Sequence, residues 1–168
     1  MTGGPGHGPA DAPVVLLRET VRPEWIDYNG HLSEAYYVLV FGFATDALYD
    51  HVGMGDAFRR RTKTSVYTVE AHITYLSEVG EGAPLEIATR VLDLDSKRAR
   101  VFHAMHRGDD GALLATIELM LLHVDATGPR AAPFPDEVLA RLQALHEAQA
   151  GQPPPPQAGR AIAIPRRA

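Results

Sequence analysis

The chain contains no cysteine, a single tryptophan among its 168 residues, and fewer basic than acidic side chains. The absence of cysteine excludes disulfide bonds and thiolate chemistry and leaves the redox compartment open. Lysine and arginine number 16 against 21 aspartates and glutamates, and the formal net charge of -5 argues against a nucleic-acid surface. No apolar run reaches the ~20 residues that cross a bilayer, and the first residues do not have the pattern of a secretory signal. We therefore expect a cytoplasmic protein with no membrane association.

The rest of the composition is that of an ordinary globular domain, with 45% hydrophobic and 22% charged residues. We expect one domain over residues 13–150. Residues 1–12 are mostly glycine, proline and alanine, which predicts a flexible N-terminus. Residues 151–168 form a proline-rich tail. Two interpretations of this tail are open: a free end, or an arm that lies across a neighbouring subunit through Ile162 and Ile164.

One long helix is predicted from His31 to about Asp50. Apolar side chains recur there at steps of three and four. They are Leu32, Ala35, Tyr36, Leu39, Val40, Phe43, Ala47 and Leu48. Further apolar residues lie outside this stripe, so we expect the helix to be buried on most sides. Asn29 or Ser33 is expected to cap its start.

The remaining pattern predicts mostly strands. Residues 67–75 alternate, which places Tyr67, Val69 and Tyr75 on one face and Glu70 and His72 on the other. A polar loop is expected over 54–65. The other expected elements are strands over 14–21, 83–95, 97–108 and 112–124 and a helix over 134–148. This order predicts an α+β fold in which one antiparallel sheet wraps a long helix. Its uncovered edges and faces predict a homodimer or a homotetramer.

A group of polar side chains lies directly before the long helix. In "WIDYNGHLSEAYY", Asp27, Asn29 and His31 occupy every second position. The least specific interpretation is that Asp27 and Asn29 are turn and capping residues, because Asn-Gly favours a tight turn.

Several long segments between Val14 and Ala148 carry a family resemblance. They are "PEWIDYNGHLSEAYYVLVFGFATDALYD", "YTVEAHITYLSEV", "VLDLDSKRARVFHAMH", "ATIELMLLHVD" and "PFPDEVLARL". They resemble betainyl-CoA thioesterases, hot-dog-fold enzymes of the 4-hydroxybenzoyl-CoA thioesterase-like superfamily. The resemblance implies hydrolysis of betainyl-CoA to glycine betaine and coenzyme A in carnitine degradation, without a cofactor. Carnitine dehydrogenase is the implied functional partner. Two alternatives are a general short- or medium-chain acyl-CoA thioesterase and a non-catalytic acyl-binding module.

The resemblance also implies roles for the polar residues before the helix. Asp27 is the expected catalytic carboxylate, either as the nucleophile or as the base that deprotonates water. Asn29 and His31 are expected to orient the water or the thioester. Backbone N–H groups near Ser33 and Glu34 are suited to the oxyanion.

A betaine acyl group carries a fixed cation, so aromatic and acidic side chains are expected to bind it. The acidic candidate is Glu34, and the aromatic candidates, of a type also common in hydrophobic cores, are Trp25, Tyr28, Tyr36, Tyr37 and Tyr67. Glu70 either lines the same site or forms a salt bridge across the dimer. The strand histidines lack metal-ligand spacing, so no metal is expected.

Overall fold

The computed structural model describes residues 13–164. In chain order its elements are β1 (Val14–Thr20), η1 (Pro23–Trp25), α1 (Glu34–His51), α2 (Asp56–Thr62), β2 (Thr64–Tyr75), β3 (Pro84–Leu94), β4 (Arg98–Arg107), β5 (Leu113–Asp125), β6 (Arg130–Ala131) and α3 (Asp136–Ala148). The predicted order of strands and long helices is confirmed. The expected loop over 54–65 is wrong, because α2 occupies most of it and buries Phe58. The expected flexible N-terminus lies outside the described residues.

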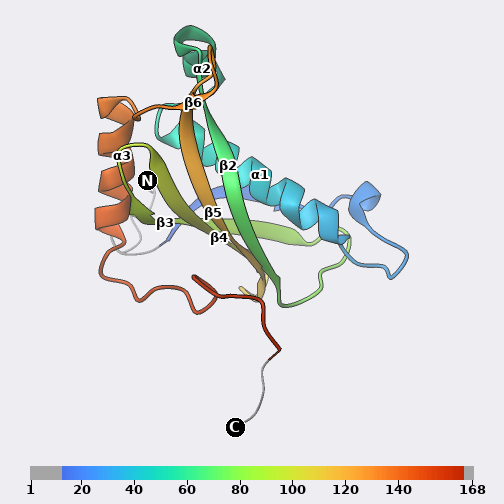
Figure 1. Ribbon diagram of the computed structural model, residues 1–168. Helices are drawn as coiled ribbons and strands as arrows, with labels where there is room; N and C mark the ends of the chain where they lie inside the picture. Colours follow the sequence, from blue (N-terminus) through green and yellow to red (C-terminus); the bar gives the residue numbers. More distant parts are fainter. Residues whose placement is uncertain (1–12, 165–168) are drawn as a thin grey trace, which may run out of the picture.

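The strands form one antiparallel sheet in the order β1-β3-β4-β5-β2, and β6 pairs with β5. α1 crosses one face of this curled sheet, and α3 stands beside β3 (Figure 1). We call the sheet face that packs on α1 the inner face and the opposite one the outer face. A long helix wrapped by one antiparallel sheet is the α+β hot-dog arrangement, and this prediction is confirmed.

A β-bulge in β2 decides which of its side chains face α1. The pairing of β2 with β5 shifts between Thr68 and Glu70, so Val69 is an additional residue. Thr68 and Ala71 therefore both lie on the inner face, whereas Tyr67 and Glu70 lie on the outer face. The predicted alternation is wrong for the first half of the strand, because a strict period of two does not allow for an inserted residue.

α1 is buried along a different stripe from the predicted one. Its buried residues are Tyr37, Val40, Phe41, Ala44, Thr45, Leu48 and Tyr49. Val38 and Leu39 are 47% and 40% exposed, so the prediction that Leu39 is buried is wrong for the single chain. Because the helix is apolar nearly all round, its periodicity does not identify the side that meets the sheet.

A buried histidine connects α1 to two strands. His103 of β4 is fully buried, and its ring stacks on Phe41. Thr45 of α1 donates its hydroxyl hydrogen to the Phe41 carbonyl oxygen at 3.0 Å, so it accepts the bond from His103 Nε2 at 3.1 Å. His103 Nδ1 then accepts from the Thr89 hydroxyl at 2.9 Å. Burial lowers the pKa of His103 to about 3, so the ring is neutral and bonded on both nitrogens.

Candidate functional site

The segment before α1 folds into a tight hairpin loop. Ile26 and Leu32 form an antiparallel bridge, and the Asp27 N–H donates to the His31 carbonyl oxygen at 2.9 Å. The Gly30 N–H donates to the Asp27 carbonyl oxygen at 3.0 Å, and Gly30 has a φ of 83°. That left-handed conformation favours glycine. The loop therefore places the backbones of Asp27 and His31 side by side, with Asn29 exposed at the tip.

The two oxygens of the partly buried Asp27 carboxylate differ in their hydrogen bonding. Its Oδ1 accepts a hydrogen bond from the Asn29 N–H at 2.8 Å, which holds the turn. Within residues 13–164, Oδ2 has no hydrogen-bond partner. One oxygen thus stabilises the loop, and the other is available to a water molecule or a thioester.

Two backbone amides at the start of α1 also lack partners within the described residues. The Leu32 N–H donates to the Val79 carbonyl oxygen at 2.8 Å, and the Ser33 N–H donates to the Trp25 carbonyl oxygen at 2.9 Å. Ser33 is the N-cap residue, yet its side chain makes no capping bond. The Glu34 and Ala35 amides remain for an acceptor. The candidate oxyanion donors therefore begin one residue later than the sequence suggested.

His31 lies in a surface groove of about 570 Å³ that the Gly80–Gly82 segment also lines. Its Nδ1 is 3.4 Å from Oε2 of Glu78, and both side chains are well exposed. Arg107 contributes a positive charge to this groove but donates to Asp110 at 2.8 Å and to the Glu78 carbonyl oxygen at 3.3 Å. Glu78 is a candidate site residue that the sequence reasoning missed.

Trp25 and Tyr28 lie in contrasting surroundings. Trp25 is 3% exposed, its ring stacks on Tyr36 with a centroid separation of 5.7 Å, and the Arg22 guanidinium lies over the ring at 4.7 Å. The ring face that Arg22 covers is therefore already occupied by a cation of the protein. Tyr28 is 98% exposed at the loop tip. The described chain does not gather these aromatic side chains into one cage.

A different aromatic pair lies at the start of α1. Tyr37 is buried, donates its hydroxyl to the Ser77 carbonyl oxygen at 3.2 Å, and packs edge-on against Tyr75 at 5.4 Å. Burial and then the Glu34 carboxylate raise the pKa of Tyr75, so Glu34 lies close to that hydroxyl. Burial, followed by Glu78, Tyr75 and, more weakly, Asp27, raises the pKa of Tyr37. We call Glu34, Tyr37 and Tyr75 the acidic-aromatic cluster. The sequence reasoning missed Tyr75 as a site residue, although its place on the α1 side of a strand was a usable signal.

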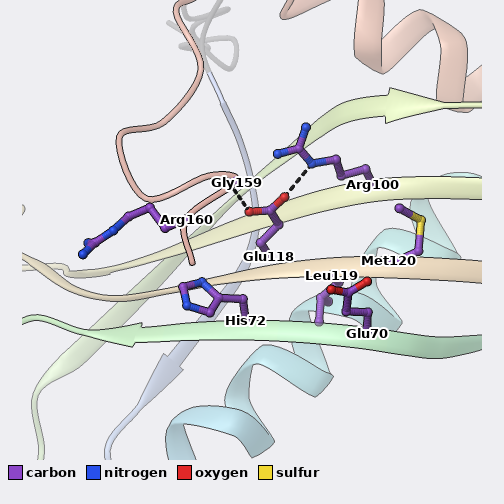
Figure 2. A pocket seen from close by; sticks show the side chains of 8 residues that line it. All are labelled: Glu70, His72, Arg100, Glu118, Leu119, Met120, Gly159 and Arg160. Carbon is purple, nitrogen blue, oxygen red and sulfur yellow. Dashed lines mark hydrogen bonds and ion pairs between the residues drawn. The ribbon is translucent and has the colours of Figure 1, made fainter. Parts of the chain in front are cut away.

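Glu70 is not brought together with this cluster. It lies on the outer face of β2 and lines a hollow of about 210 Å³ with His72, Arg100, Glu118 and the C-terminal segment. In Figure 2 the Glu118 carboxylate points between Arg100 and Gly159, while Glu70 and His72 project from the neighbouring strand.

A further groove of about 560 Å³ lies between α1 and the inner face of β2. Val38, Leu39 and Phe43 give it an apolar wall, and Asp46 and Arg59 are its charged residues. Within residues 13–164, no group of three or more histidine or acidic side chains is placed to hold a metal ion. No helix in that range is long and apolar enough to span a membrane.

Comparison with known proteins gives the family. The model of the thioesterase-like superfamily matches residues 21–142. A betainyl-CoA thioesterase of Pseudomonas aeruginosa is 49% identical over 153 residues, which are 90% of this chain and 96% of that protein. An L-carnitine dehydrogenase/betainyl-CoA thioesterase of Agrobacterium fabrum is 44% identical over 94% of this chain, and the match spans 32% of its length.

Solved structures agree with the family model. A Staphylococcus aureus protein solved in complex with CoA is 28% identical, with a TM-score of 0.84. The alignment covers 92% of this chain and 98% of that one. A hot-dog sheet, an acidic loop before the central helix, and a family match over most of the domain lead to one conclusion: this chain belongs to the thioesterase-like superfamily.

Proposed function

We propose that the protein hydrolyses betainyl-CoA to glycine betaine and coenzyme A. The observation that carries this proposal is the arrangement at the start of α1. Among residues 13–164, one Asp27 oxygen and the Glu34 and Ala35 amides have no partner there, and the acidic-aromatic cluster lies at the same helix end. The 49% identity to a betainyl-CoA thioesterase supports the choice of acyl group.

In the proposed reaction, Asp27 acts through Oδ2. It either takes a proton from the attacking water or attacks the thioester carbonyl carbon to form an anhydride that water then hydrolyses. On both routes the carbonyl oxygen becomes an oxyanion that accepts from the Glu34 and Ala35 amides, where the helix dipole adds positive potential. The carbon–sulfur bond breaks, and the leaving thiolate of coenzyme A takes up a proton that the water releases when it adds to the acyl carbon. His31 and Asn29 orient the water and the loop.

The trimethylammonium group is assigned to the acidic-aromatic cluster. A quaternary ammonium is bound by aromatic faces and nearby negative charge, since it has no hydrogen to donate. Tyr75 is 41% exposed, so part of its ring is accessible, and Glu34 is also exposed. Glu78 and Glu81 add negative charge along the adjacent groove. We therefore propose Glu34 and Tyr75 as the principal contacts to the cation, with Tyr37 fixing Tyr75.

The decisive experiment compares two thioesters of equal shape. Betainyl-CoA and tert-butylacetyl-CoA differ only in that carbon replaces the charged nitrogen. Thiol release should give a kcat/KM for betainyl-CoA that exceeds the neutral value by about tenfold or more. Equal values would overturn the betainyl assignment and leave a general acyl-CoA thioesterase. No release from either ester, or from medium-chain esters, would favour a non-catalytic module.

We also propose a homodimer formed through β2. β2 is an edge of the sheet, and Tyr67, Val69 and Leu76 are 46%, 55% and 43% exposed along or just after it. Val38 and Leu39 of α1 extend this apolar surface. A long apolar edge strand favours pairing with another chain. Carnitine dehydrogenase is the proposed functional partner, because the Agrobacterium relative carries both activities in its name.

A further inference from the structure

The C-terminal segment that follows α3 takes a directed path over the outer face of the sheet. Near β3, the Arg90 guanidinium donates to the carbonyl oxygens of Pro153 at 2.9 Å and Gln152 at 3.3 Å. Gln149, which is 3% exposed, bonds the β3 backbone at Val91 and Thr89. The segment therefore starts from a fixed position beside β3.

A second anchor lies two strands further on. The Gly159 N–H donates to Oε2 of Glu118 on β5 at 2.6 Å, and Arg100 of β4 donates to Oε1 at 2.5 Å (Figure 2). Gly159 and Arg160 line the same hollow as Glu70 and His72 of β2. Since the strand order is β3-β4-β5-β2, the segment advances toward β2, the edge strand of the sheet that residues 13–164 form.

The residues after Gly159 are long enough to pass that edge. Residues 160–164 span about 16 Å when extended, at about 3.3 Å per residue, and neighbouring strands are about 4.8 Å apart. By length, one spacing takes the chain from β5 to β2, and about two spacings remain. Ile162 and Ile164 are 92% and 83% exposed, and in an extended segment they project from the same side. Two adjacent exposed isoleucines on an anchored segment indicate a missing apolar partner.

We propose that residues 160–164 form an arm that binds the outer face of a second copy of this chain. This inference rests on the β2-edge dimer proposed above, which continues the sheet directly into the second copy. The arm of each copy then crosses the shared edge, and its isoleucines pack around Tyr67 of the other copy. Glu118 is the positioning residue that fixes the start and direction of the arm, because its carboxylate accepts the Gly159 N–H and holds it over β5.

The absence of native cysteine allows a direct test. A benzophenone maleimide is attached to an Ile162→Cys variant, and heavy-nitrogen and unlabelled chains are mixed until native mass spectrometry detects mixed dimers. After irradiation, we expect cross-links of mixed isotope composition to peptides of β2 and β5. The same label at Ala161→Cys, which projects from the opposite side of an extended arm, should cross-link less. Cross-links confined to chains of one isotope, or none in a sample shown to contain mixed dimers, would overturn the arm.

Truncation provides the second measurement. Removing residues 160–168 should raise the dimer dissociation constant by about tenfold or more, whereas removing only 165–168 should not. An unchanged constant after the longer truncation would refute the arm and leave the β2-edge dimer intact. A full-length chain that sediments as a monomer would refute both the dimer and the arm, so the two failures are distinguishable.

Discussion

The buried His103 predicts a specific loss of stability in acid. In the unfolded chain this ring titrates at its ordinary pKa of 6.5, whereas burial lowers the pKa of the folded ring to about 3. Between these values the unfolded state binds more protons, so the free energy of unfolding falls as the pH falls. The neutral ring's contribution to the free energy of unfolding is complete above pH 6.5 and is lost progressively down to about pH 3. At about pH 5 the loss is about 2 kcal/mol, which lowers the melting temperature by about 4 to 8 °C.

The matched variant is His103→Gln, whose amide replaces both ring nitrogens as donor and acceptor toward Thr45 and Thr89 but does not titrate. Chemical denaturation at about pH 7.5 and pH 5 gives a change in unfolding free energy for each protein. Other titrating groups are common to both proteins, so the wild-type change should exceed that of the variant by about 2 kcal/mol. Equal changes would refute the reasoning. If the variant does not fold, NMR titration of the wild-type His103 ring tests the lowered pKa directly. A titration midpoint near pH 6 would contradict a buried neutral histidine.

The remaining predictions concern catalysis and assembly. Asp27→Asn should lower kcat for betainyl-CoA by about a hundredfold or more with an unchanged circular dichroism spectrum, since the amide is neither a base nor a carboxylate nucleophile; near-normal turnover would exclude the mechanism. Glu34→Gln should reduce the betainyl-CoA to tert-butylacetyl-CoA ratio of kcat/KM by about tenfold, and an unchanged ratio would show that Glu34 does not sense the cation. Tyr75→Leu should reduce the same ratio while Tyr75→Phe, which keeps the ring, preserves most of it; equal effects would remove the ring from the site. Val69→Lys should shift sedimentation toward a monomer, whereas Arg18→Lys on the opposite edge strand should not.

Most of the fold was predictable because its signals are local. The long apolar helix and the β-rich segments can each be recognised from their own residues, over lengths of 7 to 18 residues. The face assignment of β2 was not predictable, because the bulge at Val69 depends on how β5 pairs with it. The buried side of α1 was also not predictable, since Val38 and Leu39 are as apolar as the residues that meet the sheet. Both failures concern which side of an element meets a neighbour, and local periodicity does not carry that information.

The candidate site also contains residues that the sequence spacing places together and a residue that only the tertiary fold brings to it. Asp27, Asn29 and His31 lie in one short loop, so their sequence spacing already placed them together. Tyr75 reaches the start of α1 only through the fold, as a strand residue 38 positions after Tyr37 that contacts its ring. Trp25 is a suitable cation binder by residue type, yet Arg22 already covers one face of its ring. Residue type gave the candidates, whereas tertiary contacts decide which of them a substrate can approach.

The bulge in β2 has a consequence for insertions and deletions. Deleting Val69 would place Thr68 directly before Glu70, and these two residues already pair with consecutive residues of β5, so every other side chain would keep its face. Deleting a residue far from the bulge, such as Ile73, would instead force the residues between the gap and the bulge, or those beyond the gap, to exchange faces. In an alignment, a one-residue gap placed at Val69 therefore preserves which residues are equivalent in space, whereas the same gap placed elsewhere in the strand does not.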